Sequence, residues 1–326
     1  MWSWQDDGNR ALVCRRVYSR VAQFGQELCA RCYAREQHQW WRVIFDAKAS
    51  MDFVFHRSYR GPLKAVILDW AGTTMDYGCF APAVVFVEVY KRKNVPITTE
   101  QAREPMGAHK KVHIRMISQM PSVQKMWEQV HCRRPTEADV EAMFEDFVPL
   151  QLDCLANYAD LIPGTLEAVS DFRRRGLKIG STTGYTTEMM EVLLSEAKRR
   201  GYEPDSSVCA AQVPEGRPHP WMCLQNAINL QVYPMEAFVK VGDTLPDISE
   251  GLNAGMWTIG LAKSGNEMGL TEQEIDALPR DVREAKLARA YQRMYQTGAH
   301  YVVDTIADVS PLLDEINVRL ARGDRP

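Results

Sequence analysis

Residues 65–74 read AVILDWAGTT, and this stretch decides the fold. Its first four residues are all apolar, which is typical of a short strand buried on both faces of a parallel sheet. The run ends at Asp69, so the strand is expected to carry a carboxylate at its carboxyl end. In open α/β sheets, ligands bind in the crevice at the carboxyl ends of the strands. The stretch therefore predicts a buried parallel strand with a binding site at its end.

Three further apolar runs follow along the chain. They read KIGST at 178–182, FVKVG at 238–242 and WTIGL at 257–261. Segments with helical periodicity separate them, including residues 187–200 and 220–230. Strands that alternate with helices favour an α/β fold with a Rossmann-like, doubly wound parallel sheet.

The stretch between the first two strands interrupts this alternation. Residues 79–155 carry helical patterns almost throughout, and Thr136 with Asp139 resembles a capping box before an apolar helical face. We therefore predict a helical cap at 79–155. It would be inserted into a core that consists of residues 63–78 and 156–326.

Polar residues follow three of the predicted strands. Asp69 ends the first strand, Thr183 follows the second, and the loop GDTLPD at 242–247 follows the third. A lone aspartate after a strand is more often a helix cap than a nucleophile. An aspartate, a threonine and a GDxxxD loop at three strand ends, in this order, are much harder to obtain by chance.

This set of residues is similar to the signature of the haloacid dehalogenase superfamily. The resemblance implies that Asp69 is the nucleophile that attacks phosphorus and that Thr183 holds a phosphoryl oxygen. Arg217, in the segment EGRP at 215–218, stands where these enzymes keep a basic residue for the phosphoryl group.

The same resemblance implies a magnesium site. Its ligands would be Asp69, Asp243 and the backbone carbonyl of Ala71, with Asp247 as a further ligand or as a partner of one. Mg²⁺ prefers oxygen ligands. It also reduces the repulsion between two anions, the carboxylate and the phosphoryl group.

Position 71 departs from the superfamily pattern. Phosphatases of the superfamily have a second aspartate two residues after the nucleophile, where it acts as a general acid on the leaving oxygen. Ala71 cannot transfer a proton, so either the enzyme is crippled or its leaving group needs no acid there. A carbon leaving group is such a case, provided that another group stabilises the departing carbanion.

A lysine in the predicted cap can supply this stabilisation, because an amine condensed with an aldehyde gives a protonated imine that accepts electrons. Residues 105–113 read PMGAHKKVH. This segment resembles the cap of the phosphonoacetaldehyde hydrolase family, where a lysine has this role, and alignment from PMG places it at Lys110 and not at Lys111. Lys110 and His113 face one side of a helix, so His113 is expected to move protons during imine formation. The amine must be neutral, so we expect a lowered pKa for Lys110.

The resemblance to this family runs from about residue 64 to the C-terminal region. It includes AGTTMDYGCF at 71–80, GSTTGYT at 180–186 and GRPHPWM at 216–222. It implies that Cys79, Met106 and Tyr185 line the substrate pocket, although Cys79 and Met106 would serve equally as packing residues. It also implies a homodimer paired through the caps. The reaction implied is the hydrolysis of phosphonoacetaldehyde to acetaldehyde and phosphate, in 2-aminoethylphosphonate degradation.

Two other functions stay open. An ordinary phosphatase or phosphomutase of the superfamily would use Asp69 in the same way, and Ala71 argues against it. A non-enzymatic regulator or binding protein would not need the complete set of superfamily residues, which argues against this second alternative.

The composition of the 326 residues excludes some classes of protein. The chain is 45% hydrophobic and 25% charged, which is typical of a folded protein. Its net charge of −3 and its pI near 6.2 give no basic surface for nucleic acid. No apolar run approaches the roughly 20 residues that cross a bilayer. Eight scattered cysteines, without the pattern of a signal peptide, favour reduced thiols and a cytoplasmic location.

The N-terminal extension, residues 1–62, differs in composition from the rest. Ten basic residues against six acidic ones give it a net charge of +4, whereas the remainder carries −7. The simplest interpretation is an upstream start codon, with Met51 as the natural start; the alternatives are a targeting arm or an interaction segment. Cys29 and Cys32 form a CxxC pair, but a zinc site needs two more well-spaced ligands, so incidental cysteines are favoured.

Overall fold

The structure is a computed structural model, and it describes residues 58–326, which form one compact unit. The predictions for the CxxC pair and for the first 57 residues lie outside the described residues. Within the described part, no helix is long and apolar enough to cross a membrane.

Six parallel strands form one sheet in the order β3-β2-β1-β4-β5-β6. The strands are β1 (Ala65–Leu68), β2 (Lys178–Thr183), β3 (Ser206–Cys209), β4 (Phe238–Gly242), β5 (Trp257–Leu261) and β6 (Tyr301–Val303). The predicted α/β fold with a doubly wound parallel sheet is confirmed, and β1, the predicted first strand, lies at its centre. The strand order reverses between β1 and β4, and ligands bind at the carboxyl ends of strands at such a switch point.

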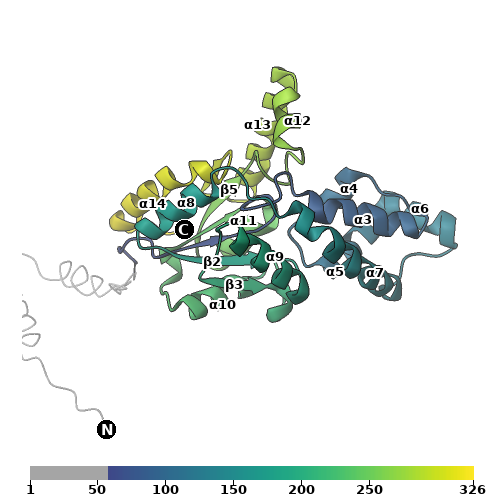
Figure 1. Ribbon diagram of the computed structural model, residues 1–326, viewed down its shortest axis with the longest axis horizontal. Helices are drawn as coiled ribbons and strands as arrows, with labels where there is room; N and C mark the ends of the chain where they lie inside the picture. Colours follow the sequence, from purple (N-terminus) through teal and green to yellow (C-terminus); the bar gives the residue numbers. More distant parts are fainter. Residues whose placement is uncertain (1–57) are drawn as a thin grey trace, which may run out of the picture. The chain divides into compact units, whose positions relative to one another are not determined.

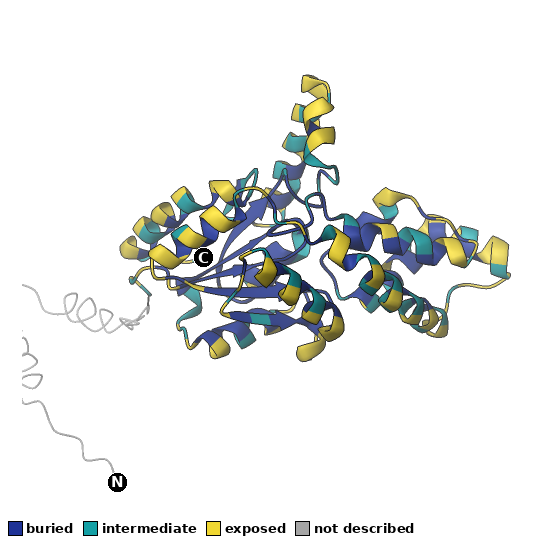
Figure 2. Cartoon of the chain, viewed as in Figure 1, coloured by how far each residue is buried: buried dark blue, intermediate teal, exposed yellow. Residues whose placement is uncertain are grey.

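The residues of β1 alternate between two apolar clusters on the two faces of the sheet. Ala65 and Ile67 belong to a cluster with Cys223 and Leu230 of α10 (Trp221–Leu230). Val66 and Leu68 belong to the larger cluster, which includes residues of α8 (Thr165–Arg174) and α14 (Ser310–Arg322). Figure 1 shows α8 and α14 on one side of the sheet and α10 on the other. Figure 2 shows buried strands beneath helices whose outer faces are exposed.

The remaining helices after β2 follow individual strands. They are α9 (Thr187–Arg199) after β2, α11 (Leu245–Asn253) after β4, and α12 (Glu272–Ala277) with α13 (Arg280–Gln296) between β5 and β6. Strands β3 and β6 were not predicted. β3 reads SSVC and has no apolar run, and β6 has only three residues.

Between β1 and residue 155 the described chain forms α-helices and no strand. They are α3 (Phe80–Arg92), α4 (Thr99–Arg103), α5 (Lys110–Ser118), α6 (Pro121–His131) and α7 (Glu137–Leu155). These helices lie together beside the sheet in Figure 1, and we call residues 80–155 the helical lobe. The capping box at the start of α7 is present, because the Asp139 carboxylate accepts a hydrogen bond from the Thr136 N–H at 2.8 Å.

A tight loop leads from β1 into the helical lobe. The carbonyl of Trp70 accepts hydrogen bonds from the N–H groups of Thr73, Thr74 and Met75. Asp76 then accepts hydrogen bonds from the N–H groups of Phe80 and Ala81 at 2.9 Å each, which satisfies the first turn of α3. The loop therefore holds the start of the lobe against the carboxyl end of β1.

Candidate active site

Three aspartates meet at the carboxyl ends of β1 and β4. Asp69 directly follows β1, Asp243 directly follows β4, and Asp247 lies in the first turn of α11. All three are buried, and one carboxylate oxygen from each lies within 4.8 Å of the others. The structure thus brings together the three carboxylates that were predicted as metal ligands.

The side chain of Asp243 is held tightly between two glycines. Thr73 donates to its Oδ1 at 3.3 Å, and the N–H of Asn266 donates to its Oδ2 at 2.8 Å. A Cβ added at Gly72 would lie 2.2 Å from Asp243 Oδ2, and one at Gly265 would lie 2.1 Å from Asp243 Cβ. Both positions therefore need glycine.

The pKa values of the three carboxyls differ because their neighbours differ. Burial, with the nearby carboxylates of Asp69 and Asp247, raises the pKa of Asp243 well above its ordinary value. Burial also raises the pKa of Asp69, although Arg217 opposes it. The pKa of Asp247 is lowered, because Arg217 and Lys240 outweigh the effect of burial.

Arg217 lies in the loop before α10 and reaches the nucleophile position. Its Nη2 donates to Asp69 Oδ1 at 2.6 Å and to the carbonyl of Thr182 at 2.8 Å. Its Nε donates to Glu250 Oε2 at 3.0 Å. The side chain is buried, and the surrounding carboxylates, acting against burial, hold its pKa well above the ordinary value. A permanent cation is therefore fixed beside Asp69.

A second buried cation, Lys240, contacts two of the carboxylates that Arg217 contacts. Its Nζ is 2.7 Å from Asp247 Oδ1 and donates to Thr182 Oγ1 at 2.9 Å. Neither Lys240 nor its neighbour Glu250 was predicted as part of the site. For Lys240 a signal was available: it is the one charged residue in the run FVKVG of β4. A charge in a buried strand is rarely kept without a partner.

The helical lobe contributes Lys110 to the same place. Lys110 is the first residue of α5, and its side chain is buried, with Nζ 4.6 Å from the ring centre of Tyr185 and 5.9 Å from that of Phe86. Burial lowers the pKa of Lys110 to about 8, although Cys79 and Asp69 act in the opposite direction. The lowered pKa agrees with the expectation for an amine that must be neutral to react.

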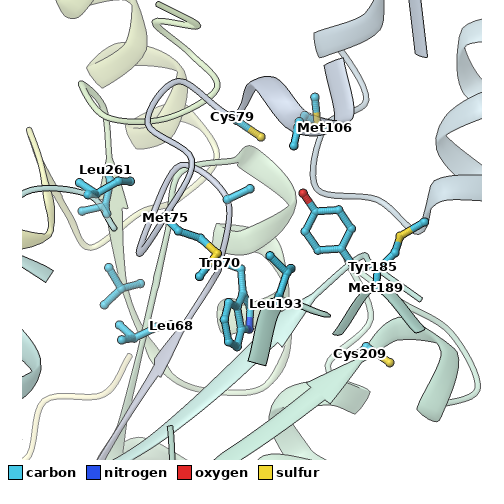
Figure 3. Packing of buried hydrophobic residues seen from close by; sticks show 14 of the residues in the cluster. Leu68, Trp70, Met75, Cys79, Met106, Tyr185, Met189, Leu193, Cys209 and Leu261 are labelled. Carbon is cyan, nitrogen blue, oxygen red and sulfur yellow. The ribbon is translucent and has the colours of Figure 1, made fainter. Parts of the chain in front are cut away.

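One cavity connects the residues predicted for the core with those predicted for the lobe. Figure 3 shows the Tyr185 hydroxyl pointing toward Met106 and Cys79. The cavity has free space of about 20 Å³, room for roughly one water molecule. A phosphonate with an aldehyde arm is larger than this free space. Its lining includes Asp69, Ala71, Cys79, Met106, Lys110, Thr183, Tyr185 and Arg217.

Asp243, Asp247 and His113 do not line this cavity. The two aspartates adjoin it through the carboxylate cluster with Asp69. His113 is completely buried, and its ring lies 3.8 Å from that of Phe86. Burial, together with the charge of Lys110, lowers the pKa of His113 well below its ordinary value.

The tautomer of His113 follows from its one hydrogen bond. Nε2 lies 2.8 Å from the carbonyl of Ala102, which can only accept, so Nε2 carries the proton in the neutral ring. Nδ1 has no hydrogen-bond partner and is then a free base. The structure therefore leaves Nδ1 of His113 without a partner at a position outside the cavity lining, and the lowered pKa keeps the ring neutral.

Lys111 provides an internal comparison for Lys110. Its side chain is partly exposed and forms an ion pair with Glu141 of α7. Adjacent positions on a helix point in different directions. The two lysines therefore have opposite surroundings, as their positions on α5 predict.

The fold and this site match known proteins. A family model described as haloacid dehalogenase-like hydrolase matches residues 63–255. Phosphonoacetaldehyde hydrolase from Syntrophobacter fumaroxidans is 52% identical, over 84% of this chain and 99% of its own length. A bifunctional phosphonoacetaldehyde hydrolase/aminoethylphosphonate transaminase from Clostridioides difficile is 42% identical, over 82% of this chain and 42% of its own length.

A solved structure agrees with these matches. The crystal structure of a phosphonoacetaldehyde hydrolase-like protein from Oleispira antarctica has a TM-score of 0.82 and 40% sequence identity, covering 84% of this chain and 99% of that one. The chain therefore belongs to the haloacid dehalogenase-like hydrolases, and within them to the phosphonoacetaldehyde hydrolase family.

Proposed function

We propose that this enzyme hydrolyses phosphonoacetaldehyde to acetaldehyde and phosphate, through an imine on Lys110 and an aspartyl-phosphate on Asp69. The observation that carries the proposal is that a buried lysine with a pKa of about 8 shares one small cavity with a buried aspartate. An ordinary phosphatase has no use for such an amine.

The reaction begins at Lys110. At neutral pH about a tenth of an amine with this pKa is uncharged and can attack the aldehyde carbon. Condensation releases one water and leaves a protonated imine. His113, with its free Nδ1, is the proposed proton acceptor for this step. Tyr185 and Phe86 exclude water from the amine through their rings.

The carbon–phosphorus bond breaks when an oxygen of Asp69 attacks phosphorus. The electron pair of that bond moves into the imine and forms an enamine, so the leaving carbon needs no proton from position 71. Ala71 fits this requirement, since it lines the cavity without a proton to give. Arg217 and Thr183 would hold the phosphoryl oxygens.

Two waters complete the reaction. The enamine takes a proton on carbon, and water then hydrolyses the imine, releasing acetaldehyde and the Lys110 amine. A second water hydrolyses the aspartyl-phosphate and releases phosphate. Because one water left during condensation, the net reaction consumes one water.

We propose Mg²⁺ as the cofactor, with Asp69, Asp243 and the Ala71 carbonyl as ligands and Asp247 as a ligand or a partner of one. The charges of the site fit a divalent cation. When no divalent cation is bound, four buried carboxylates face the two buried cations that pair with them. Burial and the carboxylates of Asp69 and Asp247 raise the pKa of Asp243. When bound, the ion would neutralise charge between the carboxylates and the phosphoryl group. The groups counted are Asp69, Asp243, Asp247 and Glu250 against Arg217 and Lys240.

We also propose that residues 79–155 act as a cap on a core of residues 63–78 and 156–326. The small cavity supports this, because substrate can enter only if the two parts move apart.

A homodimer through the caps is proposed on the family resemblance, and sedimentation of the pure chain tests it. Exposed apolar side chains of the helical lobe that could take part are Val84, Val112, Met116 and Val130. The cytoplasmic location expected from the cysteines stays a prediction.

Borohydride trapping tests the proposed reaction. The protein is incubated with phosphonoacetaldehyde and Mg²⁺, borohydride is added, and the reduced adduct is located by peptide mass spectrometry. We expect the adduct on Lys110, and phosphate release that is lost in Asp69→Asn. An adduct only on Lys111 or other surface lysines would refute the carbon–phosphorus reaction, and phosphate esters would then be tested as substrates.

A further inference from the structure

Glu250 is a buried carboxylate that the proposed reaction does not use. It is completely buried in α11 and does not line the cavity. A buried carboxylate is costly unless it is paired. Its Oε2 accepts hydrogen bonds from Arg217 Nε and Thr182 Oγ1, both at 3.0 Å, and lies 3.5 Å from Lys240 Nζ.

The guanidinium of Arg217 has different partners at its two ends: Glu250 at Nε, and Asp69, Thr182 and Asp247 at Nη2. Nε is held by Glu250, away from the cavity, while Nη2 is 2.6 Å from Asp69 Oδ1. Asp69 is the proposed nucleophile, so its contact with Nη2 has to be shared with the phosphoryl oxygens when substrate binds. The contact between Arg217 Nε and Glu250 can persist while substrate binds and reacts.

Lys240 shares the carboxylate of Asp247 with Arg217. Asp247 Oδ1 lies 2.7 Å from Lys240 Nζ and 3.0 Å from Arg217 Nη2, so the lysine compensates much of its charge. The pKa of Lys240 is raised, because Asp247 outweighs the effect of burial. Nη2 of Arg217 contacts both Asp69 and Asp247, so the bond from Nε to Glu250 is the contact that sets the direction of the planar guanidinium.

We propose that Glu250 is a positioning residue for phosphoryl binding. It fixes Nε of Arg217 so that Nη2 faces the nucleophile and the incoming phosphoryl group. The proposal rests on the proposed function in one respect, that Arg217 is the residue that binds the phosphoryl group.

Inorganic phosphate is the probe, because it needs Arg217 but no imine. Its affinity for the full chain with Mg²⁺ is measured by calorimetry in Glu250→Met and Glu250→Gln. We expect Glu250→Met to bind phosphate at least about tenfold more weakly, the effect of losing a hydrogen bond to a charged group. Glu250→Gln should recover most of this loss, because its amide oxygen can still accept from Arg217 Nε. Thr258→Val is the control for general damage: Thr258 is buried in β5 against α11, and the change removes the hydroxyl that pairs with His300 but no charge. It should bind phosphate as the unaltered chain does.

A second readout separates positioning from general damage. Acetaldehyde forms an imine at Lys110 without any phosphoryl group, so its borohydride adduct should be unchanged in Glu250→Met. If the adduct and the phosphate affinity fall together, Glu250 is only structural and the proposal is wrong. It is equally wrong if Glu250→Met binds phosphate normally. Should the unaltered chain form no adduct at Lys110, the proposed function fails, and the phosphate titration still decides the role of Glu250.

Discussion

Replacing Lys110 with methionine should stabilise the folded protein at neutral pH while abolishing imine formation. Burial lowers the pKa of Lys110 from 10.5 to about 8, so the folded chain binds this proton less tightly than the unfolded chain does. At pH 7 the difference destabilises the fold by about 3 kcal/mol. Methionine fills a similar volume without a charge, so Lys110→Met should recover most of this free energy.

The gain should also depend on pH, with a definite sign. Between pH 8 and 10.5 the folded chain has released the proton and the unfolded chain still binds it. Stability of the unaltered protein therefore rises with pH through this window. The advantage of Lys110→Met should shrink accordingly, to about 1.4 kcal/mol near pH 9.5.

Urea unfolding followed by tryptophan fluorescence, at pH 7 and near pH 9.5, measures the gain in the free energy of unfolding of Lys110→Met and its change with pH. Lys111→Met is the matched control, because Lys111 is partly exposed and paired with Glu141. Removing a surface ion pair should change the free energy of unfolding by less than about 1 kcal/mol. The reasoning would be refuted if Lys110→Met lost stability at pH 7, or if its gain were the same at both pH values.

Three further predictions concern the amine, the metal site and the helical lobe. The rate of acetaldehyde trapping at Lys110 should rise with pH and level off above about pH 8; an inflection near that of ordinary lysines would contradict the lowered pKa. Gly72→Ala should weaken Mg²⁺ binding in calorimetry by at least about tenfold, because the new Cβ would lie 2.2 Å from Asp243 Oδ2. Gly176→Ala, at a similar positive φ with nothing within 4 Å, should leave Mg²⁺ binding unchanged. Thr136→Ala should lower the free energy of unfolding by about 1 kcal/mol through loss of the N-cap, with unchanged phosphate release.

Much of the fold was predictable because most of the central strands have plain apolar runs. β1, β4 and β5 lie at mostly apolar runs, whereas β2 (KIGSTT) has one aliphatic residue. The carboxyl ends of parallel strands meet at one edge of the sheet. That geometry is what allows Asp69 and Asp243 to be placed together from sequence alone. Lys110 was harder to predict as a site residue, because it comes from the helical lobe. Only the family resemblance distinguished it from Lys111.

The other features of the fold and the site could not be predicted from the sequence, because they depend on contacts between distant residues. The serines of β3 look like a loop, yet Ser207 meets Ser181 of β2 in the structure, with their hydroxyl oxygens 2.8 Å apart. Glu250 is an ordinary helical residue in sequence, and only the position of Arg217 shows that its carboxylate is paired. His113 was expected at the pocket because of its spacing from Lys110. Spacing along a helix does not show how deeply a side chain is buried, and His113 packs against Phe86 outside the cavity lining.

The two glycines around Asp243 have a consequence for the choice of cation. A Cβ added at Gly72 or Gly265 would overlap the Asp243 side chain. There is therefore little space beside this carboxylate into which it could move to lengthen a bond to a cation. Mg²⁺ takes oxygen ligands at about 2.0–2.1 Å, whereas Ca²⁺ needs about 2.3–2.6 Å and more ligands in a flexible arrangement. In the proposed Mg²⁺ site, a carboxylate confined in this way should discriminate by ionic radius, and calcium is expected to compete poorly even where it is the more abundant ion.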